Sequence, residues 1–197
     1  SKALQHVDLP HRKQEAWRYT DLSKLYQQLF NNFETPNQAI VFDHWVYPES
    51  EAYRIFLING PLHEELSNLP DNNCVQWHSY DTGQSCGEFD QYLNDGYEFS
   101  QDAFDLLNES LARRQNILQI APNTKLDRPI ELVHCNCGGG VQMAAAPRLL
   151  ILAENSAEVT VVERITSPDR ETYFFNGLTR IELQDNARLT HHRLQDE

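Results

Sequence analysis

The segments Leu152-Ala153-Glu154-Asn155-Ser156-Ala157-Glu158-Val159-Thr160 and Leu183-Gln184-Asp185-Asn186-Ala187-Arg188-Leu189-Thr190 share one pattern. Each ends an apolar strand, turns at an acidic residue followed by asparagine, passes a small residue and begins another strand. The offset of about thirty residues lies in the range of stacked structural repeats. The pattern favours a β-solenoid, in which each turn of chain buries its inward residues on the next. A jelly roll or another sandwich would have similar short strands, so this alternative stays open.

Further short strands are predicted around the repeat. The run Tyr53–Gly60 is continuous and apolar, and it closes with Asn59-Gly60, a favoured turn pair. Other β-branched or alternating runs, separated by turn residues, predict strands at 38–47, 74–77, 117–120, 129–134, 148–153, 157–162, 177–183 and 187–194. The glycine run 138–140 is expected to be a turn between strands, because a phosphate-binding loop would need a helix directly after it.

Residues 100–114 have the pattern of an amphipathic helix. Ser100 is the expected N-cap, and Asp102 would lie in the first turn, where a negative charge is favourable. The apolar face and the basic last turn follow at helical spacing: Phe104, Leu107 and Leu111, then Arg113 and Arg114.

The segment Arg12-Lys13-Gln14-Glu15-Ala16-Trp17-Arg18-Tyr19-Thr20-Asp21-Leu22 places two aromatic residues among many charges. If the segment is extended, Trp17 and Tyr19 share a face, and arginine side chains can stack on their rings. Thr20 is a plausible N-cap for a following helix with Leu22, Leu25 and Leu29 on one face. The segment either anchors the N-terminal arm on the domain or contacts a partner, and the structural role is favoured.

Composition excludes several classes of function. The 197 residues are 40% apolar, which is sufficient for a core, and they carry a net charge of −13. Residues 25–112 contain fifteen acidic residues and one basic residue, Arg54, so this part repels phosphate backbones and anionic membrane surfaces. No run of apolar residues is long enough for a transmembrane helix, and no secretory signal is recognised. We therefore expect neither nucleic-acid nor membrane binding.

The four cysteines, Cys74, Cys86, Cys135 and Cys137, do not form a metal-binding pattern. On a strand, Cys135 and Cys137 would point to one face and His134 to the other, whereas a closed site needs about four ligands. Ordinary thiols are expected rather than ligands or disulfides, and no metal or cofactor site is assigned.

No catalytic residue is assigned either. Glycine-rich nucleotide loops, the nucleophile elbow and the paired-histidine zinc motif are all missing from the sequence. The acidic pairs Glu64/Glu65 and Glu49/Glu51 have no feature that would separate their pKa values. His191 and His192 are adjacent on a predicted strand, so one should face inward and the other outward, which does not suit a metal site.

The segment from Arg12 to Leu22 resembles the R-K-x-E-x-W-[KR]-Y-T-x-L motif near the start of SufD proteins. These belong to the SufB/SufD family of iron–sulfur cluster assembly scaffold proteins. An apolar strand ending in Asn-Gly at 55–60 and the helix at 103–111 are further points of resemblance.

This resemblance implies a fold and a partial chain. The expected architecture is mainly β: residues 1–115 form an N-terminal arm and an α/β region, and residues 116–197 begin a right-handed parallel β-helix. The family continues for roughly as long again, so we expect an N-terminal fragment without the regions that the family uses for cluster assembly and for ATPase contact. No functional residue is carried over.

The implied function is that of a non-enzymatic, cytoplasmic scaffold subunit whose full-length form has SufB and SufC as partners. The fragment itself is expected to hold no cofactor and to self-associate through the strands at 177–194. Two alternatives stay open: a carbohydrate-active β-helix protein and a stand-alone ligand-binding β domain. Fold alone does not choose among them.

Overall fold

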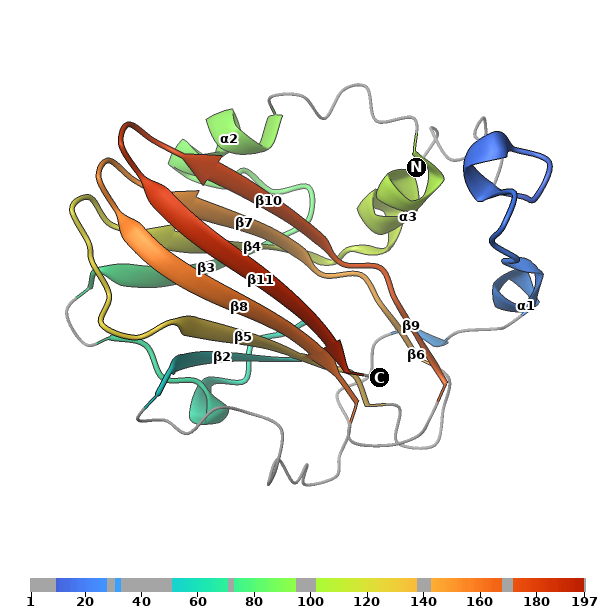
Figure 1. The fold of residues 1–197 in the computed structure, drawn as a ribbon, viewed down its shortest axis with the longest axis horizontal. Helices are drawn as coiled ribbons and strands as arrows, with labels where there is room; N and C mark the ends of the chain where they lie inside the picture. Colours follow the sequence, from blue (N-terminus) through green and yellow to red (C-terminus); the bar gives the residue numbers. More distant parts are fainter. Residues whose placement is uncertain are drawn as a thin grey trace.

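The computed structural model describes residues 10–27, 31–32, 51–70, 73–94, 102–137, 143–167 and 172–196. Strands dominate these residues, and the helices are few and short (Figure 1). The strands form two four-stranded sheets and one three-stranded sheet, in which all pairings except one are parallel. The chain is therefore mainly β with parallel sheets, as the sequence predicts.

Each sheet is named here by a central strand. The β8 sheet has the order β11-β8-β5-β2, with β2 (Tyr53–Ile58), β5 (Ile130–Cys135), β8 (Glu158–Thr166) and β11 (Arg188–Asp196). The β7 sheet has the order β10-β7-β4-β3, with β3 (Val75–Asp81), β4 (Arg114–Ile120), β7 (Arg148–Ala153) and β10 (Leu178–Leu183). The β6 sheet has the order β1-β6-β9, with β1 (Asn31–Asn32), β6 (Met143–Ala145) and β9 (Tyr173–Phe175).

The sequence repeat corresponds to the pairing register. Leu178 pairs with Arg148, Arg188 with Glu158 and Tyr173 with Met143, so one partner lies thirty residues after the other in all three sheets. The acid–asparagine turns carry the chain from the β7 sheet into the β8 sheet. They stack on each other, because the Ser156 amide donates to the Asp185 carbonyl at 2.8 Å and the Asp185 amide donates to the Asn155 side chain at 3.1 Å.

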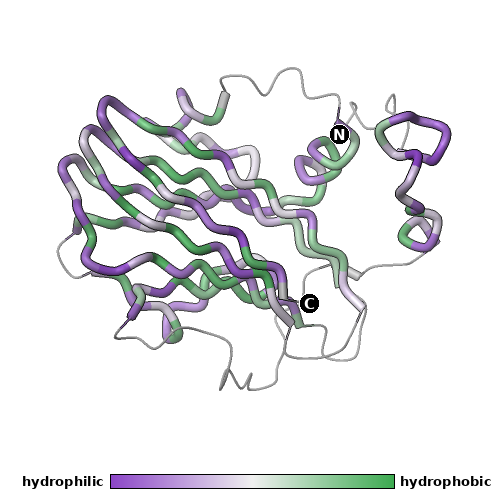
Figure 2. Tube along the Cα trace, viewed as in Figure 1, coloured by the Kyte–Doolittle hydropathy of each residue, from purple (hydrophilic) through white to green (hydrophobic). Residues whose placement is uncertain are grey.

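The main core lies between the β7 and β8 sheets, where apolar side chains of both sheets form one buried cluster. The strands of both sheets carry many hydrophobic residues (Figure 2). The fully buried members of the core include Ile55, Leu132, Leu118 and Ile151. The other face of the β7 sheet is covered by η4 (Gly87–Phe89) and α2 (Asp90–Asn94), where Phe89 packs against Ile117 and Leu150. Strand β7 is thus buried on both faces, which explains the near-continuous apolar run in Arg148–Ala153.

Helix α3 (Ala103–Leu111) lies beside the strands, as predicted, but its ends and buried face differ from the prediction. Its N-cap is Asp102, not Ser100, because the Asp102 carboxylate accepts hydrogen bonds from the amides of Phe104 and Asp105. The buried positions are Ala103, Leu106 and Asn108 rather than the predicted apolar face. Arg113 and Arg114 lie beyond the helix, and Arg114 begins β4.

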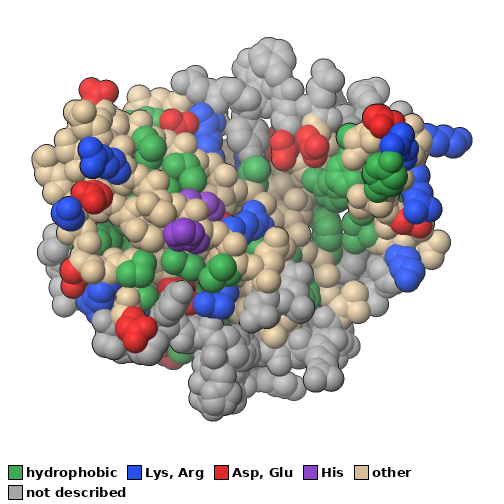
Figure 3. All heavy atoms as spheres, viewed as in Figure 1, with side chains coloured by type: hydrophobic (Ala, Val, Ile, Leu, Met, Phe, Trp, Pro, Cys, Tyr) green, Lys and Arg blue, Asp and Glu red, His purple; other side chains and the backbone are tan. Residues whose placement is uncertain are grey.

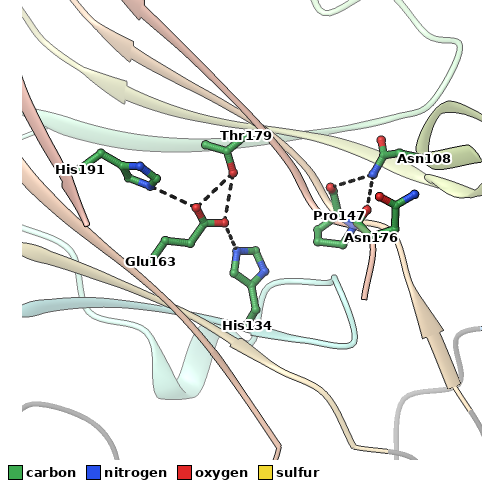
Figure 4. A network of polar contacts seen from close by, with 7 residues as sticks. All are labelled: Asn108, His134, Pro147, Glu163, Asn176, Thr179 and His191. Carbon is green, nitrogen blue, oxygen red and sulfur yellow. Dashed lines mark hydrogen bonds and ion pairs between the residues drawn. The ribbon is translucent and has the colours of Figure 1, made fainter. Parts of the chain in front are cut away.

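Asn108 joins α3 to the strands. Its side-chain amide donates to the carbonyl oxygens of Pro147 at 3.2 Å and Asn176 at 2.5 Å (Figure 4). The Asn176 side chain in turn donates to the Phe104 carbonyl at 2.8 Å. A polar residue therefore occupies the most buried position of the helix, and it satisfies backbone groups at the starts of β7 and β10.

The N-terminal arm is not extended, contrary to the prediction. It contains the one-turn helix η2 (Glu15–Trp17) and the short helix α1 (Ser23–Tyr26). The Trp17 ring contacts the Phe104 ring of α3 in a tilted arrangement, with centroids 5.6 Å apart, whereas Tyr19 is 83% exposed, so Trp17 and Tyr19 do not share a face. Arg18 does stack on the Tyr19 ring, at 4.5 Å. The helix begins at Ser23 with Leu22, not the predicted Thr20, at the N-cap position, and Asp21 accepts from the Ser23 amide.

Some elements differ from the prediction in other ways. Strand β3 is longer than the predicted 74–77 because it pairs along its whole length, antiparallel, with β4. Several elements were not predicted because they are too short for a periodic pattern: β1, β6, β9, η3 (Glu64–Leu66), η4 and α2. The predictions for 38–47, Leu29 and the glycine run 138–140 concern residues outside the described parts of the chain.

Candidate functional site

Glu163 is the centre of the most buried polar network between the two large sheets. It lies in the middle of β8, paired in register with Leu132 of β5 and Arg193 of β11. Strand alternation gives Glu163 the same direction as Val161, which belongs to the main core. A carboxylate thus lies on the core-facing side of β8, where strand alternation would predict an apolar side chain.

Three side chains direct hydrogen bonds at this carboxylate (Figure 4). His134 Nε2, from β5, lies 2.9 Å from Oε1, and His191 Nε2, from β11, lies 3.1 Å from Oε2. The Thr179 hydroxyl, from β10 in the facing sheet, donates at 3.1 Å and 3.2 Å to the two oxygens. The network therefore joins four strands and crosses from one sheet to the other.

The surroundings keep Glu163 ionised although its side chain is only 1% exposed. Burial by itself raises the pKa of this carboxyl, because desolvation disfavours the charged form. The hydrogen bond and charge of His134, the charge of Arg193 and the hydrogen bond from Thr179 outweigh burial and lower the pKa from 4.5 to about 2. Glu163 is therefore ionised at every physiological pH.

This arrangement suits a link between the sheets better than a catalytic group. A carboxylate offers about four lone-pair directions, and the donors from His134, His191 and Thr179 already occupy its two oxygens. His134 is also held by an edge-on contact with the Phe175 ring at 5.2 Å. Within the described parts of the chain, both oxygens are therefore engaged by protein donors rather than presented to a substrate.

A second buried carboxylate lies on the opposite face of the β8 sheet. Glu131 of β5 is fully buried between Arg54 of β2, at 3.5 Å, and Arg164 of β8, at 3.0 Å. One sheet thus carries an acid–base link on each face. Both links span adjacent strands that are distant in sequence.

The four cysteines lie in different parts of the fold. Cys135 and Cys137 are buried together beside Ile58, and Cys74 borders the main core. Cys86 directly precedes η4 and is buried in the cluster of Phe89 and Ile117. Burial, together with the nearby Asp90, raises the pKa of the Cys86 thiol, which keeps it protonated. Among the described residues no three His, Cys, Asp or Glu side chains form a group that could hold a metal ion.

The histidine pair at 191–192 divides as expected. His191 is half-buried and reaches Glu163, and His192 is exposed on the opposite face of β11. His134 and His191, considered separately in the sequence, meet at one carboxylate. Sequence reasoning missed Glu163 and Glu131, although acidic residues inside apolar strands such as Glu158–Thr166 were a signal.

Two family models together match all of the chain except residues 133–135. The model described as the SufBD protein N-terminal region matches residues 1–132. The chain belongs to the SufBD family. A second model, described as SUF system FeS cluster assembly, SufBD core domain, matches residues 136–197 of this SufBD chain.

Curated proteins with similar sequences support the same family. The chain is 30% identical to an iron–sulfur cluster assembly SufBD family protein of Synechocystis, over 98% of the chain and 45% of that protein. It is 26% identical to Protein ABCI7, chloroplastic, of Arabidopsis thaliana, over 100% of the chain and 43% of that protein. It is 27% identical to the iron–sulfur cluster assembly protein SufD of Escherichia coli, over 98% of the chain and 44% of that protein. This SufBD chain spans less than half the length of these relatives.

No helix among the described residues of the SufBD chain is both long and apolar enough to cross a membrane.

Proposed function

We propose that this SufBD chain is the N-terminal part of a non-enzymatic scaffold subunit for iron–sulfur cluster assembly. The observation that carries the proposal is the match of both family models, which together extend from residue 1 to residue 197. The Glu163 network supports a structural role, because its polar groups form hydrogen bonds with each other and are not directed at a substrate.

The proposed scaffold is a right-handed parallel β-helix whose first turns lie in residues 116–197, after an arm and α/β region at 1–115. The thirty-residue register in three sheets supports it, since each turn of such a helix contributes one strand to each sheet. In this fold the Glu163 network links the sides of adjacent turns.

The proposed partners of the full-length subunit are SufB and SufC, and its proposed location is the cytoplasm. The SufD name of the Escherichia coli relative supports these partners. No cofactor is assigned to the described part of the chain. Self-association through β10 and β11 is a further proposal, supported by the exposed apolar side chains Ile181, Leu183 and Leu194.

The test is a pull-down with purified SufB and SufC, using the full-length protein and residues 1–197 side by side. We expect the full-length protein to form a complex and the N-terminal part alone to bind SufC weakly or not at all. A scaffold role is contradicted if the full-length protein is folded, as judged by circular dichroism, and still binds neither partner. Turnover of a polysaccharide by the same protein would favour the carbohydrate-active alternative.

A further inference from the structure

A cavity of about 340 Å³ lies where the turn after β2 meets the start of β4 and the chain before β7. Its lining includes Asn59 and Gly60 from the turn, Arg113 and Arg114 from the start of β4, and Pro147. The volume is at the lower end of the range for small-molecule sites. None of the residues of the Glu163 network contributes to it.

The walls of this cavity are held by hydrogen bonds from buried asparagines. Asn59 accepts from the Cys137 amide at 3.0 Å and donates to the Cys137 carbonyl at 2.9 Å. Asn116 accepts from the Ser79 hydroxyl at 2.9 Å, and Asn108 donates to the Pro147 carbonyl at 3.2 Å. The cavity is therefore formed before any ligand arrives, so a ligand would not have to order its walls.

The charge of the cavity is unusual for this chain. Arg113 and Arg114 line it together with a single carboxylate, Asp81, whereas residues 25–112 contain only one basic residue. An arginine side chain presents a planar fork of donors that matches the oxygens of a carboxylate or phosphate. Two adjacent arginines at a pocket of an acidic protein point to an anionic ligand.

Arg114 is held by contacts that a ligand can replace at little cost. Its Nη2 lies 3.8 Å from the Asp81 carboxylate, and its Nη1 lies 3.4 Å from the Ser79 hydroxyl. The Arg114 and Asp81 side chains are 51% and 61% exposed, and an exposed ion pair of this length contributes little free energy. A ligand oxyanion at normal hydrogen-bond distance would bind Arg114 more strongly than Asp81 does.

We propose that this cavity binds a small molecule through a carboxylate or phosphate group, with Arg114 as the main contact and Arg113 as its neighbour. Asp81 competes for Arg114 and so weakens binding. The site goes beyond the proposed scaffold role, since the partners of the scaffold are proteins.

The experiment titrates residues 1–197 with inorganic phosphate and, separately, with citrate at low and constant ionic strength, using amide NMR shifts as the readout. We expect shifts at Gly60 and Arg114 for at least one of the two anions, and the comparison identifies phosphate or carboxylate as the preferred group. Arg114→Gln should weaken binding by about tenfold. Asp81→Asn should strengthen it by about two- to fivefold, because the competing charge is removed.

The matched control is Arg188→Gln at the start of β11, which removes the same charge outside the cavity. It should leave both affinities unchanged, and Arg113→Gln provides a second variant if Arg114→Gln does not fold. The proposal is overturned if the wild-type protein binds neither anion. It is also overturned if Arg188→Gln weakens binding as much as Arg114→Gln does, or if Asp81→Asn fails to strengthen it.

Discussion

Glu163 stays charged in the interior because His134, His191 and Thr179 all direct polar hydrogens at its two oxygens. A buried carboxylate without such partners would take up a proton, since desolvation raises its pKa. Replacing one partner therefore leaves an uncompensated polar group in the core, which is costly. The contribution of this network to stability should depend on pH in a defined direction.

The Glu163→Gln variant tests that dependence. The pKa of Glu163 is lowered from 4.5 to about 2 in the folded protein, so its ionised form stabilises the fold. This stabilisation is fully present above pH 4.5 and is lost as the pH falls towards about 2, and the pKa change corresponds to about 3 kcal/mol. Urea unfolding across this range should show the wild-type advantage over Glu163→Gln shrinking by about that amount.

The control for this measurement is Glu88→Gln, which alters an exposed carboxyl on η4. Its difference from the wild-type protein should stay near zero at every pH. A Glu163→Gln difference that is constant between neutral pH and the acid limit would contradict the role assigned to the charge.

Trp17 and Phe104 provide a second test at the residue scale. Their rings are 5.6 Å apart and tilted by 47°, a geometry that contributes about 0.5–1.5 kcal/mol beyond buried area. A double-mutant cycle with Trp17→Ala and Phe104→Ala should give a coupling free energy of about 1 kcal/mol in urea unfolding. Tyr19→Ala should show no coupling to Phe104→Ala, because Tyr19 is exposed. A Trp17–Phe104 coupling near zero would mean that the motif does not anchor the arm.

At the scale of elements, α3 is positioned by a cap and a buried amide as well as by its buried apolar residues Ala103 and Leu106. Asp102 satisfies two amides at its start, and Asn108 satisfies two carbonyls of the chain that leads into β7 and β10. The sequence predicted the helix because its apolar residues recur at helical spacing. It misplaced the cap because Ser100 and Asp102 are both good N-cap residues, and local pattern does not decide between them.

Two substitutions of Asp102 distinguish the stability that its capping hydrogen bonds contribute from the stability that its charge contributes. Asp102→Ala should lower the free energy of unfolding by about 1 kcal/mol, because the amides of Phe104 and Asp105 lose their acceptor. Asp102→Asn keeps a capping oxygen and should retain most of the stability. Chemical denaturation of both variants provides the measurement. Equal losses would assign the effect to charge instead of capping.

At the scale of the whole molecule, the last strand of each large sheet is more exposed than the strand beneath it. Ile181 and Leu183 of β10 are 37% and 48% exposed, whereas their register partners Ile151 and Ala153 of β7 are fully buried. The difference follows from how the strands stack: β7 and β8 are covered by β10 and β11, which pair with them. Within the described residues nothing covers β10 and β11 on their outer side (Figure 3).

This exposed layer predicts self-association of residues 1–197. Apolar side chains beside an open strand edge favour pairing with a second copy. Sedimentation velocity should show the average mass rising with concentration, and Leu183→Glu should reduce the rise by placing a charge in the contact. Tyr19→Glu, on the arm, serves as the matched control and should not change it. A protein that stays monomeric at high concentration would contradict this prediction.

The sequence by itself determined the elements whose patterns are local and repeated. The acid–asparagine turns, the strands on either side of them and the helix at 103–111 follow from turn chemistry and periodicity, which act over a few residues. The motif at Arg12–Leu22 indicated the family through its residue types and spacing alone. The division at residue 115 and the β-helix stay predictions.

Only the tertiary structure decided which polar residues meet. Glu163, His134, Thr179 and His191 lie on four strands, and their contact depends on a pairing register that no local pattern specifies. The same holds for the cavity at Arg114, whose walls come from segments far apart in the chain. Sequence pattern reports which face of a strand is buried, whereas the charges brought together on that face are set by how the sheets stack.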